Sequence, residues 1–167
     1  MSIKELYDSP LGTITLVSDG TSLTAVHLPK WEDRVPPEGL SNHLFTKEQH
    51  DLSALAETRR WLDCYFSGQI PDFIPALKPQ GTPFQQKVWH ELLTIPYGQT
   101  VSYGEIARRI GCRSAQAIGQ AVHCNPIAII IPCHRVIGAD GSLTGYASGL
   151  GIKRWLLKME KASHLLF

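Results

Sequence analysis

Hydrophobic and polar residues alternate along three short runs near the N-terminus. These runs, residues 4–7, 13–18 and 23–28, are separated by turn-forming Asp, Ser, Pro and Gly. Alternation with a period of two is typical of strands that bury one face. The pattern therefore predicts a β-meander over the first 28 residues.

The spacing changes in the following stretch. Residues 31–46 hold two adjacent prolines among scattered polar groups and predict a loop. Apolar residues then recur every three or four positions, which favours a helix from about residue 47 to residue 66. Residues 70–77 predict one further strand, and Lys-Pro-Gln-Gly at 78–81 marks a joint. We therefore divide the chain into an α/β domain, residues 1–78, and a second domain, residues 79–167.

The second half carries signals for three short helices. The first begins at a Thr-Pro pair, residues 82–83. Ser102 begins the second, with Glu105 three residues later completing a capping box. Ser114 begins the third, over residues 115–123. The sequence thus predicts a mostly helical second domain.

The second and third of these helices, joined by a turn that contains Gly111, match a helix-turn-helix pattern. The third carries small side chains, which would let another surface approach its backbone: Ala115, Ala117, Gly119 and Ala121. Such a pair of helices either binds DNA or packs as an ordinary αα-hairpin in a core. The pattern alone leaves both interpretations open.

Residues 131–136 read Ile-Pro-Cys-His-Arg-Val and are the most informative chemically. The apolar run 127–131 predicts a buried strand, which would end at Cys133 with His134 and Arg135 beside it. A base and a fixed cation can convert a thiol into a thiolate, the nucleophilic form. A single cysteine is more often a small buried hydrophobe, so the motif alone is compatible with either role.

Composition excludes several classes of protein. The first 25 residues contain charged groups and no long apolar stretch, and the longest apolar run is far too short to span a membrane. We therefore expect a cytoplasmic protein. The four cysteines show no Cys-x-x-Cys spacing, so we expect no metal site. In a reducing compartment we also expect no disulfide, and we expect no cofactor.

Charge is distributed unevenly between the two halves. Residues 1–80 hold 7 Lys/Arg and 11 Asp/Glu, whereas residues 81–167 hold 9 and 4, for a net charge of +1. A basic half on a nearly neutral protein indicates a polyanionic partner for that half. A chance distribution of surface charge is the alternative.

Several motifs occur together in an order that resembles the O6-alkylguanine-DNA alkyltransferases. They are Gly81–Trp89, Ile95–Gly98, Ser102-Tyr103, Asn125-Pro126, Ile131–Val136, Gly145-Tyr146 and Trp155–Leu157. The match is dense over residues 81–160 and looser over residues 1–80. The resemblance implies an N-terminal ribonuclease-H-like α/β domain, followed by a mostly α, winged-helix-like domain that binds DNA through its helix-turn-helix.

The resemblance also implies a function. The protein would flip an O6-alkylguanine out of double-stranded DNA, from the minor groove, and move the alkyl group irreversibly to Cys133. O4-alkylthymine would be a second substrate. Each molecule would act once, as a monomer and without a cofactor; cooperative binding along DNA is left open.

Residue roles follow from the same resemblance. Glu160 would orient His134, which would act on Cys133 through a water molecule, and Tyr103 would face guanine N3. The substrate pocket would be formed by Asn125, Val136, Tyr146, Ala147 and Ser148. DNA contacts would come from Arg113, Ser114, Ala115, Gln116, Ala117, Gly119 and Arg135, with Arg135 also bracing the site. Further candidates for phosphate contacts are Lys87, Arg108 and Arg109.

Two positions depart from the pattern of the family. Gln116 stands where many members have an arginine that fills the gap left by the flipped base, so we expect weaker lesion capture. Ser148 stands where many have glycine, and its side chain would narrow the pocket against bulky alkyl groups.

Three other functions remain to be distinguished. A non-catalytic lesion binder of the alkyltransferase-like kind carries another residue in place of the cysteine, which the presence of Cys133 argues against. A winged-helix transcription factor would not need Tyr103 or Glu160. A Cys-His hydrolase would turn over repeatedly without DNA.

Overall fold

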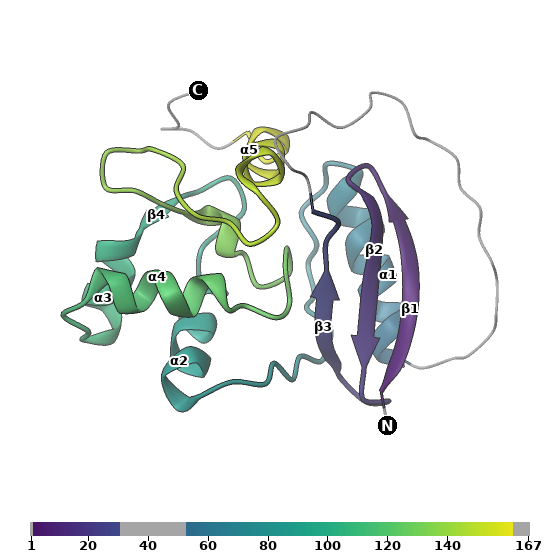
Figure 1. The fold of residues 1–167 in the computed structure, drawn as a ribbon. Coiled ribbons are helices and arrows are strands. Elements are labelled where there is room, and N and C mark those ends of the chain that lie inside the picture. The colour runs from purple at the N-terminus through teal and green to yellow at the C-terminus, as the bar shows by residue number, and fades with distance from the viewer. Residues whose placement is uncertain (1, 31–52, 162–167) are drawn as a thin grey trace.

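The computed structural model describes residues 2–30 and 53–161. In the N-terminal half, one helix covers a face of a three-stranded antiparallel sheet with the order β1-β2-β3 (Figure 1). Its elements are β1 (Ile3–Ser9), β2 (Gly12–Ser18), β3 (Leu23–His27) and α1 (Ser53–Phe66). The predicted β-meander is thereby confirmed. The predicted loop at 31–46, and the predicted helix before residue 53, lie outside the described residues.

The C-terminal half is mostly helical, as predicted, and its elements gather on the other side of the molecule (Figure 1). The helices are α2 (Pro83–Leu92), α3 (Tyr103–Ile110), α4 (Ala115–His123) and α5 (Leu150–Met159). The strands β4 (Val101–Ser102) and β5 (Val136–Ile137) form a short parallel pair. This sheet-and-helix half followed by a helical half is the fold class that the sequence predicts.

The helices of the second half begin at the expected caps. Thr82 and Gln85 form a complete capping box at the start of α2. The Ser102 and Ser114 hydroxyls each accept from a backbone amide in the first turn of α3 and α4. The capping box expected at Glu105 is not formed, because its carboxylate pairs with the guanidinium groups of Arg108 and Arg109 instead.

Residues 70–77, predicted as a strand, do not form one. Only Leu77 makes a bridge, to Leu23 at the edge of β3. Ile70 and Ile74 are 66% and 56% exposed, and the prolines at 71 and 75 lack the N–H that a strand ladder requires. The apolar content of this segment gave a wrong prediction because its prolines block the pairing.

The second wrong strand lies at residues 127–131. The Ile131 amide donates to the Ile127 carbonyl over 3.1 Å, and Ile129 has φ of +71°, a left-handed conformation that branched side chains rarely adopt. The segment is a compact buried turn. The predicted burial of this segment is confirmed. The predicted strand is wrong, because the chain reverses there.

The same turn joins the two halves of the molecule. The Val26 amide of β3 donates to the Pro126 carbonyl over 2.9 Å, and Val26 and Ile127 form a parallel bridge. The segment that leads to Cys133 is therefore fastened to the edge of the N-terminal sheet.

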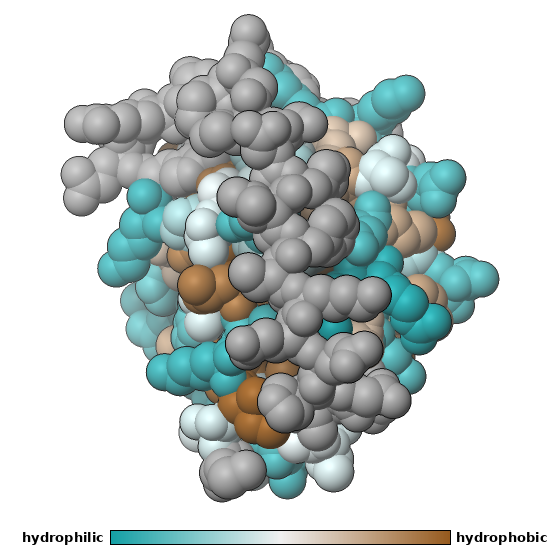
Figure 2. Space-filling model, turned by 90° about the vertical axis from the view of Figure 1, so that its right-hand side faces the viewer, coloured by the Kyte–Doolittle hydropathy of each residue, from teal (hydrophilic) through white to brown (hydrophobic). Residues whose placement is uncertain are grey.

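The face that carries β1 mixes hydrophilic and hydrophobic side chains (Figure 2). Leu6 of β1 is 69% exposed, the highest value among the large apolar residues that the structure describes. Across residues 2–30 and 53–161, no helix combines the length and the apolar character needed to cross a bilayer.

Trp89 locks α2 against α4. Its indole is 1% exposed, and its N–H donates to the Ala121 carbonyl over 2.8 Å. A Cβ atom at Gly81 would lie only 2.4 Å from the Trp89 ring. The glycine before α2 is therefore required by packing.

We expect Gly81→Ala to destabilise the protein by about 1–3 kcal/mol, because the ring of Trp89 must move. Gly104→Ala is the matched control: it lies inside α3 with its nearest neighbour 3.9 Å away, and alanine there should be neutral or stabilising by about 0.5–1 kcal/mol. Urea unfolding measures both. Equal free energies of unfolding for the two variants would contradict the packing argument.

Candidate active site

Cys133 begins a single 3-10 turn, Cys133–Arg135, at the foot of a small cavity. The cavity has a volume of about 270 Å³, and the Cys133 side chain is 6% exposed. Four of the predicted pocket residues line it with Cys133: Asn125, Tyr146, Ala147 and Ser148. The wall opposite comes from β3 and the residues after it, including His27 and Lys30, which sequence reasoning did not assign to the pocket.

His134 and Glu160 are buried next to each other, as predicted. Nε2 of His134 lies 2.8 Å from Oε1 of Glu160. An ionised carboxylate only accepts, so His134 must donate from Nε2 and keep the lone pair on Nδ1. Nδ1 is buried and has no hydrogen-bond partner among the described residues. It is therefore the ring atom that can take a proton.

Arg135 faces inward rather than toward a nucleic acid. Its Nε and Nη2 donate to the two oxygens of Glu160 over 2.9 Å each, and Nη1 donates to the Ile95 carbonyl over 2.8 Å. The guanidinium also lies over the Tyr97 ring. The assignment of Arg135 as a DNA contact is corrected: a buried guanidinium with these partners braces the site.

Glu160 receives two more hydrogen bonds, so five donors converge on one carboxylate. The Tyr65 hydroxyl donates to Oε1 over 2.7 Å and the Gly98 amide to Oε2 over 3.3 Å. Burial alone would raise the pKa of Glu160, but the hydrogen bonds from His134 and Arg135 and the charge of Arg135 hold that pKa well below its usual range. The group is an anion at neutral pH.

The thiol of Cys133 is not activated in this structure. Burial raises the pKa of Cys133 above its ordinary value, against smaller opposing effects from Asn125, Lys153 and Tyr146. Burial also lowers the pKa of His134, which Glu160 only partly offsets. Cys133 is thus a neutral thiol here, and the neutral imidazole of His134 is available as its base.

Asn125, one of the predicted pocket residues, closes the turn that leads to Cys133. Its amide nitrogen donates to the Ile131 carbonyl over 2.8 Å, and its amide oxygen accepts from the Ile127 amide over 3.0 Å. Val136, the next predicted pocket residue, is fully buried in β5, and its amide donates to the Cys133 carbonyl.

Tyr103, Tyr146 and Lys153 lie close enough to Cys133 to interact with it electrostatically. The Tyr103 hydroxyl and the Lys153 amine both donate to the Thr144 carbonyl, over 3.1 and 2.8 Å. Burial lowers the pKa of Lys153 to about 8. The buried Tyr146 hydroxyl interacts with Cys133 but makes no hydrogen bond of ordinary geometry within the described chain. Tyr103 and Lys153 thus fix the loop before α5 at Thr144.

The exposed side of α4 forms a shallow groove beside the cavity of Cys133. Tyr103 and five residues at or facing α4 line it: Ala115, Gln116, Ala117, Gly119 and Gln120. Arg113, Ser114, Ala115 and Gln116 are exposed, while Ala117 and Gly119 are half-buried. The predicted DNA contacts at residues 113–119 therefore lie on or next to one surface, which adjoins the cavity of Cys133 at His123 and Gly145.

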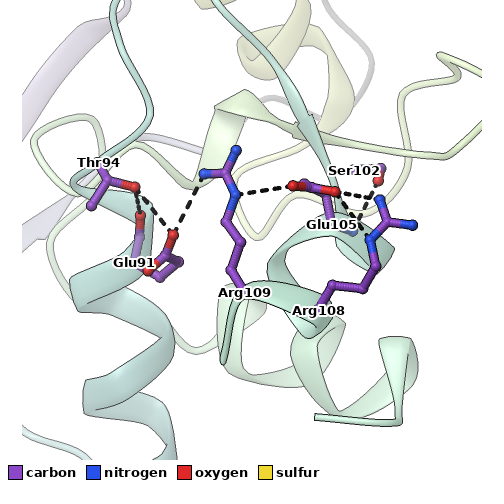
Figure 3. Close-up of polar contacts among 6 residues, drawn as sticks. All are labelled: Glu91, Thr94, Ser102, Glu105, Arg108 and Arg109. Carbon is purple, nitrogen blue, oxygen red and sulfur yellow. Dashed lines mark hydrogen bonds and ion pairs between the residues drawn. The ribbon is translucent and has the colours of Figure 1, made fainter. Parts of the chain in front are cut away.

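The candidate phosphate contacts on α3 are already paired. Figure 3 shows Arg109 between Glu91 of α2 and Glu105, and Arg108 beside Glu105. Lys87 donates to the Ile110 carbonyl over 3.1 Å. These charges are partly compensated within the protein, and their role as phosphate contacts stays a prediction.

Besides His27 and Lys30, sequence reasoning missed two further groups at the site. Lys153 falls at a buried position of α5 beside Ile152, where a lysine is unusual, and that pattern could have indicated it. Tyr65 gave no separate signal, because it belongs to the apolar face of α1. Within residues 2–30 and 53–161, no three His, Cys, Asp or Glu residues are grouped to hold a metal ion.

We expect Glu160→Gln to lower the free energy of unfolding by about 3–5 kcal/mol at pH 7, because Arg135 loses its buried partner. A carboxylate whose pKa is lower in the folded than in the unfolded protein stabilises the fold at pH values above its unfolded-state pKa. This stabilisation is lost as the pH falls toward the folded-state pKa. The difference from wild type should shrink below about pH 4.3.

Urea unfolding between pH 7 and pH 3 measures this dependence. Glu105→Gln is the control, since the exposed pairs of Glu105 with Arg108 and Arg109 are screened by water and should contribute far less than the buried pair of Glu160. A difference for Glu160→Gln that stays constant across the range would contradict the assigned ionisation.

Comparisons with known proteins agree with this arrangement. Residues 83–162 match the 6-O-methylguanine DNA methyltransferase DNA-binding domain, and residues 3–77 match the ribonuclease-like domain of the same family. The methylated-DNA–protein-cysteine methyltransferase of Methanosarcina acetivorans is 46% identical over 158 residues, covering 93% of this chain and 96% of the relative. That of Mycobacterium tuberculosis is 47% identical over 156 residues, with 93% and 90% covered.

Two solved structures extend the comparison to the fold. Mycobacterium tuberculosis OGT in complex with DNA gives a TM-score of 0.77 at 45% identity, covering 97% of this chain and 94% of that one. The O6-methylguanine DNA methyltransferase of Methanococcus jannaschii gives 0.66 at 27% identity, with 100% and 96% covered. In sequence and in fold, the chain belongs to the 6-O-methylguanine DNA methyltransferase family.

Proposed function

We propose that the protein is a methylated-DNA–protein-cysteine methyltransferase, which repairs DNA by moving an alkyl group from O6 of guanine to its own Cys133. The observation that carries this proposal is the thiol of Cys133 at the foot of a cavity, next to a neutral imidazole oriented by a buried carboxylate. Family membership and the adjoining groove on α4 support it.

The chemistry begins with removal of the thiol proton. His134 takes it on Nδ1, through a bridging water, while Glu160 stabilises the imidazolium that forms. The thiolate then attacks the alkyl carbon, so that an S–C bond forms as the C–O6 bond breaks. The electron pair returns to the purine, which takes up a proton. The thioether is stable, and the protein acts once.

Donors around the cavity would assist the leaving group. The Tyr103 hydroxyl, which here donates to the Thr144 carbonyl, would donate to guanine N3. The backbone amide of Ala147 or Ser148 would face O6, and the carbonyls of Cys133 and Val136 would accept from the exocyclic amine. Such donors stabilise the charge that develops on a departing base.

The groove on α4 is the proposed contact with double-stranded DNA. Its small side chains allow the backbone to approach the minor groove, and Gln116 would occupy the space left by the flipped base. Arg113 and Ser114 at the start of the helix would contact phosphates. We further propose a monomer that works in the cytoplasm and also accepts O4-alkylthymine.

We expect a duplex with radiolabelled O6-methylguanine to leave one label per molecule, on the peptide that contains Cys133. Cys133→Ala should take no label and bind the duplex as tightly as wild type. Cys124→Ala is the matched control, because this exposed cysteine lies at the end of α4, and it should label fully. Repeated turnover, or labelling of Cys133→Ala, would overturn the proposal.

We expect Gln116→Arg to bind lesion-containing duplex about threefold to tenfold more tightly at low salt, because an added cation meets the DNA. Gln120→Arg, one turn further along the same groove, controls for charge alone. Single-turnover rates should rise more for Gln116→Arg than for Gln120→Arg. Unchanged affinity and rate in Gln116→Arg would show that residue 116 does not limit lesion capture.

A further inference from the structure

Tyr65 is the point at which the N-terminal half reaches the proton relay. It lies in α1, 95 positions before Glu160, and its hydroxyl donates to Oε1 over 2.7 Å. The Tyr65 side chain is fully buried. Among the described residues of the family's ribonuclease-like domain, residues 3–77, it is the one whose side chain forms a hydrogen bond with Glu160.

The hydroxyl competes with His134 for one oxygen atom. Oε1 of Glu160 accepts from Tyr65, from Nε2 of His134 over 2.8 Å and from Nη2 of Arg135 over 2.9 Å. Burial and the Glu160 charge raise the pKa of Tyr65 well above its usual value. The hydroxyl therefore keeps its proton and acts as a donor throughout the working range.

We propose that Tyr65 is a positioning residue through which the N-terminal domain sets how strongly Glu160 holds the imidazole of His134, and so how readily His134 takes the thiol proton. This inference rests on the proposed function. A donor on Oε1 draws off negative charge that would otherwise stabilise the imidazolium. Without the Tyr65 hydroxyl, the pKa of His134 rises. His134 then stays protonated up to a higher pH, and a protonated imidazole cannot accept the thiol proton.

Other charged groups face the same pair and stay in place when the hydroxyl is removed. Arg135 from the 3-10 turn and Lys153 from α5 act on His134. Tyr97, between α2 and β4, and Tyr146, in the loop before α5, face Glu160. These groups contribute equally in wild type and in a variant that lacks only the Tyr65 hydroxyl. A change in the pKa of His134 in such a variant therefore measures the effect of that hydroxyl.

The ring of Tyr65 is held independently of its hydroxyl. It stacks on Trp61 with 5.1 Å between ring centroids and meets the edge of Tyr97 at 6.0 Å. Tyr65→Phe therefore removes the donor and keeps the packing. Tyr7→Phe is the matched control, because the Tyr7 hydroxyl also donates to a carboxylate, Asp63, in the same half of the protein.

The decisive measurement is the pH dependence of the single-turnover transfer rate. Tyr65→Phe should move the acid-side midpoint upward by about half a pH unit or more, while Tyr7→Phe should leave it at the wild-type value. A tyrosine analogue with a more acidic hydroxyl, Tyr65→3-fluorotyrosine, should move it downward. Midpoints that agree among wild type, Tyr65→Phe and the fluorinated protein would overturn the inference.

A titration of the His134 imidazole by NMR, without DNA, separates this inference from the proposed function. The inference predicts a higher pKa for His134 in Tyr65→Phe than in wild type, whether or not label is transferred. An unchanged pKa for His134 with normal transfer would remove the role of Tyr65 alone. Absence of transfer by wild type would remove the proposed function alone.

Discussion

Burying an ionised carboxylate without partners costs several kcal/mol. At Glu160 the surrounding groups of the site offset this cost. Arg135 supplies a permanent charge through two hydrogen bonds, and His134, Tyr65 and the Gly98 amide supply the rest. Because these donors come from three segments (the 3-10 turn Cys133–Arg135, helix α1 and the loop at Gly98), the carboxylate fixes the relative positions of all three. The tautomer of His134, and hence the reactivity of Cys133, follows from that anion.

Local signals in the sequence predicted much of this molecule. Caps at Thr82, Ser102 and Ser114 act within one turn of their own helices, so they can be read without knowledge of the fold. The meander follows from simple alternation. Motif resemblance then placed Cys133, His134 and Glu160 together, which spacing alone could not do, because 26 positions separate the last two.

What the sequence could not give depends on contacts between distant segments. The turn at residues 127–131 has the composition of a strand, and only the bond from Val26 to Pro126 shows why it reverses against β3. The raised pKa of the Cys133 thiol results from burial, which the neighbouring His and Arg letters do not reveal. Tyr65 looked like one more apolar position of α1. Part of the positive charge of the second half is also neutralised within the protein, since Arg109 forms ion pairs with Glu91 and Glu105.

The long sequence separation across the two halves has a consequence for folding. Pairs such as Tyr65 with Glu160 and Val26 with Pro126 close very large loops, and contacts of that kind form late. An intermediate with both halves formed but not yet docked would lack the hydrogen bond from Tyr65 to Glu160, and the turn that leads to Cys133 would not be fastened to β3. Repair competence would then be acquired only in the final docking step. A molecule that acts once could then use its single transfer only after this docking step.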